Sequence, residues 1–139
     1  MKRRMPTYYI SHGGGPWPWM EDRRRIFAKL EESFLRVPDE LPERPKAILM
    51  ISGHWETETV SVMHAAHPPM VYDYYNFPPH TYEVTYPSPG APDLAERTAA
   101  LLQETGLPVE LNETQGYDHG TFVPMAILYP DADIPLFQV

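Results

Sequence analysis

The residues best suited to chemistry in this chain are histidines that follow short apolar runs. His12 comes after Tyr8-Tyr9-Ile10-Ser11 and before three glycines, and His54 comes after Ile48-Leu49-Met50-Ile51-Ser52-Gly53. Open α/β sheets collect ligands beyond the carboxyl ends of their strands, so the two imidazoles can converge although 42 positions separate them. Neutral imidazole is the commonest metal ligand among side chains. The pattern predicts a metal site on two strand ends.

His119 is a third candidate, because it lies in the loop Gly116-Tyr117-Asp118-His119-Gly120 between an expected strand and an expected helix. From the residues alone, His12, His54 and His119 could form a three-imidazole site with an open fourth position. Alternatively, Glu56 could supply the carboxylate of a two-histidine, one-carboxylate iron site. A lone histidine in such a loop more often bonds to nearby backbone. The matching surroundings of His12 and His54 favour metal binding or catalysis.

The other histidines and several aromatic residues frame this candidate site. His64, His67 and His80 lie among prolines and tyrosines without ligand spacing, which predicts loop residues, with His80 suited to a pocket mouth. Large aromatic side chains gather in sequence around the three favoured histidines and would suit a flat aromatic substrate. They are Trp17, Trp19, Trp55 and Tyr117.

Composition limits the kind of protein and its partners. The 139 residues suit a single domain over 1–139, and the formal charge of −8, with 19 acidic and 11 basic side chains, argues against nucleic acid and anionic membranes. The absence of cysteine excludes disulfides and thiolate ligands, which leaves a metal to His, Asp and Glu. No apolar segment is long enough to span a membrane, and the expected location is cytoplasmic.

Two other chemistries find little support. Gly13-Gly14-Gly15 has neither the lysine of a P-loop nor the spacing of a dinucleotide-binding loop. Ser11 and Ser52 do not lie in a G-x-S-x-G turn, which disfavours a serine hydrolase.

Strand and helix patterns alternate along the chain. Strands are expected over 7–11, 46–52, 57–63, 109–111 and 134–139, with 46–52 buried on both faces. Helices are expected over 21–37, from Pro92 to shortly before Gly106, and over 122–129, while the proline-rich stretch 64–91 is expected to cover the sheet edge or the pocket mouth. The class is therefore α/β, with a largely parallel or mixed central sheet flanked by helices.

Four motifs together resemble the class III extradiol ring-cleavage dioxygenases, in the DOPA 4,5-dioxygenase-like branch of the LigB superfamily. They are Ile10-Ser11-His12-Gly13-Gly14-Gly15-Pro16, Ser52-Gly53-His54-Trp55, Tyr86-Pro87-Ser88-Pro89-Gly90-Ala91-Pro92 and Gly116-Tyr117-Asp118-His119-Gly120. The resemblance implies that His12 and His54 hold a metal, Fe(II) in active enzymes and sometimes Zn(II) in purified ones. It implies that His119 is not a ligand but a catalytic hydrogen-bonding group over the substrate, a small aromatic diol, and O₂.

One departure from this family concerns length. Its members are longer, and their second half supplies the remaining metal ligand and another catalytic histidine. We therefore expect the chain to be the N-terminal half of a dioxygenase, a truncated catalytic domain. An exposed terminal strand and an incomplete ligand set favour association into a homo-oligomer. The rival functions are a non-enzymatic LigB-like protein that binds a metal or ligand, and a zinc-dependent hydrolase using the same histidines.

Overall fold

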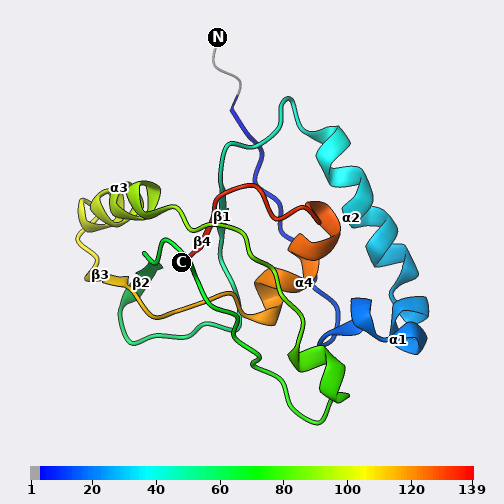
Figure 1. The fold of residues 1–139 in the computed structure, drawn as a ribbon. Helices are drawn as coiled ribbons and strands as arrows, with labels where there is room; N and C mark the ends of the chain where they lie inside the picture. The colour runs from blue at the N-terminus through cyan, green and yellow to red at the C-terminus, as the bar shows by residue number, and fades with distance from the viewer. Residues whose placement is uncertain (1–3) are drawn as a thin grey trace.

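The computed structural model describes residues 4–139, which fold around a central helix. Along the chain the elements are η1 (Trp17–Trp19), α1 (Glu21–Ile26), α2 (Ala28–Glu40), β1 (Ile48–Met50), β2 (Val60–Met63), η2 (Pro79–Tyr82), α3 (Pro92–Gln103), β3 (Val109–Asn112), α4 (His119–Leu128) and β4 (Leu136–Gln138). Helix α4 lies between α2 on one side and β2, β3 and α3 on the other (Figure 1). The predicted α/β class is confirmed.

The strand pairs are parallel, as predicted. Strand β1 pairs with β4, in the register Ile48 with Leu136, and β2 pairs with β3, in the register Val60 with Val109. Within residues 4–139 these pairs form two two-stranded sheets, where we expected one central sheet. The terminal strand β4 is buried at all three positions, because β1 covers one edge and Pro89 accepts a hydrogen bond from the Leu136 amide. The expectation of an exposed terminal strand was therefore wrong.

Two expectations about strands were wrong because pairing depends on distant backbone. The segment 7–11 forms no strand with any described residue, and Tyr9 is fully exposed. A strand needs a neighbouring backbone to take its N–H and C=O groups. Strand β1 was expected to be buried on both faces, yet Leu49 is 44% exposed and Ile51, just after it, is 77% exposed. With β4 as its one partner among the described residues, β1 is an edge strand.

The helix predicted over 21–37 is interrupted and extends further than expected. Phe27 leaves the helical conformation, at φ −94° and ψ 16°, and separates α1 from α2. Helix α2 then continues through Pro38 to Glu40, so proline does not end it there. Ile26, just before the break, is 76% exposed, whereas Phe34 of α2 is buried.

Helix α3 begins at Pro92, and Gly106 follows its end with φ +87°, which confirms the proline–glycine pattern. Its buried positions are Ala95 and Ala99, whereas Leu94 and Leu101 are exposed. Small side chains let the helix approach β2 and β3 closely.

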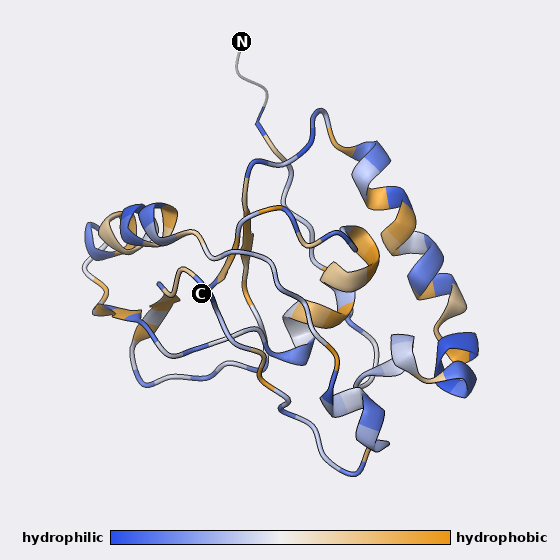
Figure 2. Cartoon of the chain, in the orientation of Figure 1, coloured by the Kyte–Doolittle hydropathy of each residue, from blue (hydrophilic) through white to orange (hydrophobic). Residues whose placement is uncertain are grey.

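Helix α4 forms the centre of the core. It begins at His119, three residues before the expected start, and every residue from His119 to Met125 is buried. The helix is predominantly hydrophobic around its circumference (Figure 2), as expected of a helix surrounded by protein. Its buried first turn places His119 inside the molecule.

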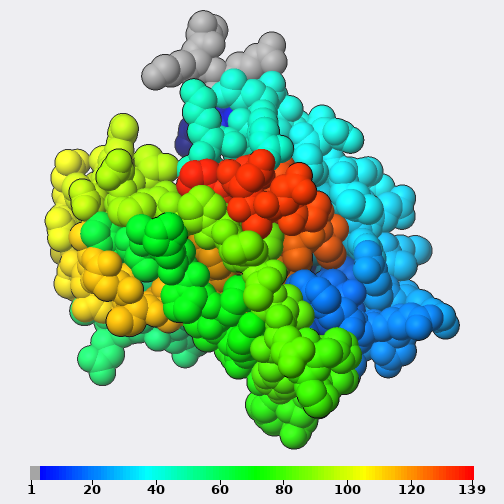
Figure 3. All heavy atoms as spheres, viewed as in Figure 1, coloured from blue at the N-terminus to red at the C-terminus, as the bar shows by residue number. Residues whose placement is uncertain are grey.

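The stretch 64–91 packs against the loop that leads into α4. The Tyr117 amide donates to Pro69 O, and Val71 N donates to Tyr117 O. A Cβ at Gly116 would lie 1.9 Å from Pro69 O, so this approach requires glycine. Further along, the turn around η2 lies beside the N-terminal part of the chain that contains η1 and α1 (Figure 3), and Arg23 lies over the Phe77 ring there.

Among the helices of residues 4–139, none has the length and apolar character needed to cross a membrane.

Candidate metal centre

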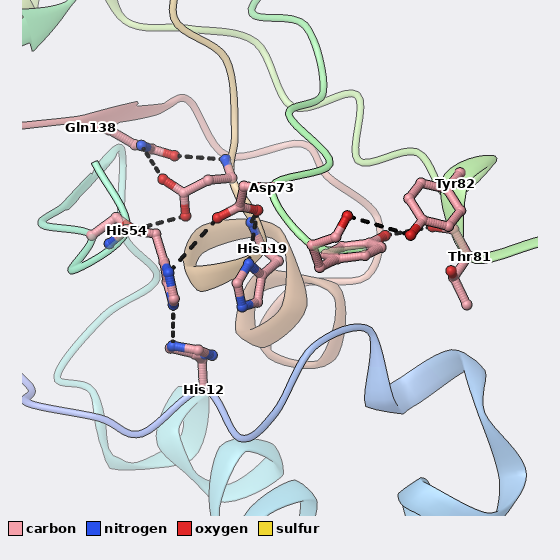
Figure 4. A network of polar contacts seen from close by, with 10 residues as sticks. His12, His54, Asp73, Thr81, Tyr82, His119 and Gln138 are labelled. Atoms are coloured by element: carbon pink, nitrogen blue, oxygen red, sulfur yellow. Dashed lines mark hydrogen bonds and ion pairs between the residues drawn. The ribbon is translucent and has the colours of Figure 1, made fainter. Parts of the chain in front are cut away.

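Three histidines from distant parts of the chain meet beside the start of α4. His12 lies in the loop before η1, His54 follows β1, and His119 opens α4. One ring nitrogen from each lies within 4.8 Å of the others, and the Nε2 atoms of His12 and His54 are 2.8 Å apart. The rings point toward a common region (Figure 4). The structure thus brings together all three histidines that the sequence singled out.

The position of His12 is set by a tight turn against Trp17. Gly13 has φ +79°, and a Cβ on it would lie 2.5 Å from Trp17 Nε1. That indole nitrogen donates to His12 O at 2.8 Å, and Trp17 is fully buried. The glycine at position 13 therefore allows the backbone to approach the buried indole closely, and this contact fixes the backbone position of His12.

The position of His54 is fixed by Ser52 and the start of α4. Ser52 Oγ accepts from His54 N at 3.2 Å and donates to Asp118 Oδ1 at 2.7 Å. Gln138 Nε2 donates to Asp118 Oδ2 at 2.9 Å, so β4 joins the same network. A Cβ at Gly120 would lie 2.8 Å from Ser52 Oγ, so glycine allows α4 to come this close to the loop after β1. Sequence reasoning gave no role in the site to Ser52 or Gln138.

His119 is oriented by a residue that sequence reasoning missed. Asp73 Oδ1 accepts from the Nδ1 of His119 at 2.7 Å and from its backbone N at 3.0 Å. The other oxygen, Oδ2, lies 3.8 Å from His54 Nδ1. Asp73 lies in the stretch 64–91, which has no regular period, and its one local signal is an acidic residue between tyrosines.

Burial and neighbouring charges shift two pKa values in the centre. Burial lowers the pKa of His12, and the neighbouring imidazoles of His119 and His54 lower it further. This favours the neutral ring that a metal requires. Burial acts to raise the pKa of Asp73, but its hydrogen bonds from His119 outweigh that effect and the net pKa lies below the ordinary value. Asp73 is therefore a carboxylate acceptor at neutral pH.

The donor set suits a metal ion. Imidazole nitrogens bind zinc at about 2.0–2.1 Å, so two on one cation lie about 3–4 Å apart. The Nε2 atoms of His12 and His54 lie 2.8 Å apart, and one ring nitrogen from each of the three histidines lies within 4.8 Å of the others. Both values are close to the separation that two imidazole ligands of one cation need. The buried Nδ1 of His12 has no hydrogen-bond partner among residues 4–139. The simple alternative of a histidine bonded to loop backbone therefore does not describe His12.

The remaining candidates lie outside the cluster. Glu56 is exposed and is absent from the group of potential ligands in residues 4–139, so the structure gives no support to a carboxylate ligand there. His64 contacts Glu113 and Glu96, and His80 Nε2 lies 2.8 Å from Trp19 O. Trp17 and Tyr117 are fully buried core residues. Tyr74, which the sequence did not single out, lies edge-on to His119, with ring centroids 5.7 Å apart.

Comparison with known proteins identifies the family. Residues 6–139 match the family model described as the catalytic LigB subunit of aromatic ring-opening dioxygenase. The chain belongs to the LigB family. This confirms the resemblance inferred from the four motifs, and the match covers almost the whole sequence.

Relatives in the LigB family share more than a third of their aligned residues with this chain. The dioxygenase tasH of Hapsidospora irregularis is 41% identical over 96% of the chain and 43% of its own length. The 4,5-DOPA dioxygenase extradiol of Mirabilis jalapa is 37% identical, over 96% of the chain and 48% of its own length. The Escherichia coli K12 protein of the same name is 38% identical, over 98% of the chain and 47% of its own length. The chain therefore spans about half the length of these relatives.

A solved structure resembles the fold as well. The crystal structure of an uncharacterized protein from Escherichia coli K12 aligns with a TM-score of 0.59 at 36% identity, over 78% of this chain and 38% of that one. The likeness supports the LigB arrangement of helices and small parallel sheets seen here.

Proposed function

We propose that this chain carries the metal-binding and proton-handling histidines of an extradiol dioxygenase that opens the ring of a catechol with O₂. The observation that carries the proposal is the convergence of His12, His54 and His119 within 4.8 Å in a LigB-family chain. A DOPA-like catechol is the proposed substrate, in keeping with the names of the relatives from Mirabilis jalapa and Escherichia coli.

His12 and His54 are the proposed metal ligands, with Fe(II) as the working metal and Zn(II) as one that a purified protein can carry. When bound, the metal would supply Lewis acidity and a template for the two hydroxyl groups of the substrate. The lowered pKa of His12 keeps its ring neutral for that task. Ser52 holds the His54 backbone, so the ring enters the site from a fixed position.

His119 is the proposed catalytic residue. Its Nδ1 is engaged by Asp73, which leaves Nε2 to exchange a proton with a substrate hydroxyl or to hydrogen-bond the substrate or O₂. His119 is 6% exposed, so it acts where protein largely excludes bulk water. Tyr74, edge-on to this ring, provides an aromatic surface beside it.

Iron loading of alanine variants tests these roles separately. After anaerobic Fe(II) loading, we expect His12→Ala and His54→Ala to lose stoichiometric iron, whereas His119→Ala retains iron and loses catechol-dependent O₂ uptake. Metal content is measured on the folded protein and does not require turnover. Stoichiometric iron in the His54→Ala variant would overturn the ligand assignment. Iron binding without O₂ uptake in the wild-type chain would restrict the role of this chain on its own to metal binding.

A further inference from the structure

The carboxylate of Asp73 stands between two histidines of the cluster. It accepts hydrogen bonds from the ring and the backbone of His119, at 2.7 Å and 3.0 Å, and its second oxygen lies 3.8 Å from His54 Nδ1 (Figure 4). Its side chain is 20% exposed. One carboxylate thus reaches the outer side of two rings whose other nitrogens face the centre.

The two bonds to His119 fix both the position and the protonation pattern of its ring. A neutral imidazole carries one proton, and a carboxylate that accepts from Nδ1 favours the tautomer with that proton on Nδ1. The lone pair of Nε2 then points to the cluster. The bond to the backbone N satisfies one free N–H of the first turn of α4, which the side chain of the N-cap Asp118 leaves unbonded.

Contacts on both sides hold Asp73 in place. On one side, Val71 N donates to Tyr117 O at 2.8 Å. On the other side, the hydroxyl of the buried Tyr74 donates to Thr81 O at 2.5 Å. The carboxylate is therefore presented by a segment anchored to the core, although that segment contains no helix or strand between 71 and 78.

We propose that Asp73 is the positioning residue of this centre, which holds His119 in the Nδ1–H tautomer and turns its Nε2 toward the site. The proposal rests on the proposed function, because it assigns His119 a working Nε2. The competing explanation is that Asp73 only caps α4. A cap would stabilise the helix without determining which ring nitrogen of His119 carries the proton.

Nuclear magnetic resonance of ¹⁵N-labelled, metal-free protein tests the proposal directly. The two tautomers of a neutral histidine differ in the chemical shifts of their ring nitrogens, and these shifts are measured at pH 8. We expect the Nδ1–H form to predominate at His119 in the wild type. In Asp73→Ala we expect the ratio of Nδ1–H to Nε2–H to fall at least tenfold, because the charge-assisted bond is lost.

Two further variants keep the test decisive. Asp73→Asn keeps the size of the side chain and a neutral acceptor oxygen, so it can replace the alanine variant if that variant does not fold. For Asp73→Asn we expect a smaller fall in the ratio of Nδ1–H to Nε2–H at His119. Glu96→Gln is the matched control, since Glu96 lies 2.9 Å from Nε2 of His64 outside the cluster, and it should leave the His119 tautomer unchanged. A wild-type His119 in the Nε2–H form, or an unchanged ratio in the folded Asp73 variants, would overturn the proposal.

Failure of this proposal can be separated from failure of the proposed function. Co(II) titration of the wild-type chain, followed by visible absorption, reports metal binding and does not depend on the tautomer measurement. Co(II) binding with an unchanged tautomer ratio in Asp73→Ala would refute the positioning role alone. An altered ratio without Co(II) binding would support the positioning role and refute the metal centre.

Discussion

Single glycines decide how closely the histidine-bearing segments approach one another, and two of the glycines beside the candidate centre, Gly120 and Gly53, differ in this respect. A Cβ at Gly120 would lie 2.8 Å from Ser52 Oγ and 3.0 Å from both Asp118 Oδ1 and His54 Cδ2. A Cβ at Gly53 would have no heavy atom within 4 Å. Gly53 precedes His54 in the chain, and a Cβ at Gly120 would approach the same histidine, so the two positions form a matched pair for testing close packing.

We expect Gly120→Ala to destabilise the fold and weaken metal binding, although alanine is the better helix former. Overpacking costs about 1–3 kcal/mol, whereas the gain in helix propensity is about 1 kcal/mol. Chemical denaturation of the two variants measures the difference. Gly53→Ala should be neutral or slightly stabilising. If Gly120→Ala proved as stable as wild type with the same Co(II) affinity, the close contact between α4 and the Ser52 loop would not be needed.

At the scale of elements, local sequence patterns predicted which histidines form the candidate centre. They did not predict the residues around those histidines. A short apolar run that ends in Ser and His is visible in the sequence, and it led to His12 and His54. Asp73 could not be found this way, because its partner His119 lies 46 positions further on and no period marks it. The burial of β1 was misjudged for the same reason, since it depends on which distant backbone pairs with each edge.

One histidine outside the centre links three elements. His64 follows β2, and its ring contacts Glu96 of α3 and Glu113 after β3. Hydrogen bonds with Glu113 and Glu96 raise the pKa of His64 above the ordinary value. The protonated ring can donate from both nitrogens, so it connects the two carboxylates.

This contact should make stability depend on pH. A group whose pKa is raised on folding contributes fully below its unfolded pKa of about 6.5 and loses the contribution as pH rises through the folded value. Because both glutamates are mostly exposed, the contribution should not exceed about 1 kcal/mol. Urea unfolding between pH 5.5 and 9 should show this loss, and His64→Gln should abolish that part of the pH dependence. An unchanged dependence of stability on pH in His64→Gln would assign that dependence to other groups.

For the whole molecule, a cation at the candidate centre would join segments that are far apart along the chain. The three histidines lie at positions 12, 54 and 119, in the loop before η1, after β1 and at the start of α4. An ion that binds the folded chain and not the unfolded chain stabilises it by mass action, by about 2.7 kcal/mol at a concentration one hundred times Kd. The metal would therefore act as a structural link as well as a reagent.

Thermal unfolding with and without metal measures this link. For a chain of this length, 2.7 kcal/mol corresponds to a rise in Tm of about 5–10 °C. We expect this rise with Zn(II) or anaerobic Fe(II) in the wild type and in His67→Ala, whose exposed histidine lies outside the cluster. The rise should vanish in His54→Ala and be reversed by chelation in the wild type. An equal rise in His54→Ala would place the stabilising metal elsewhere, because the two Nε2 atoms only 2.8 Å apart could no longer share it.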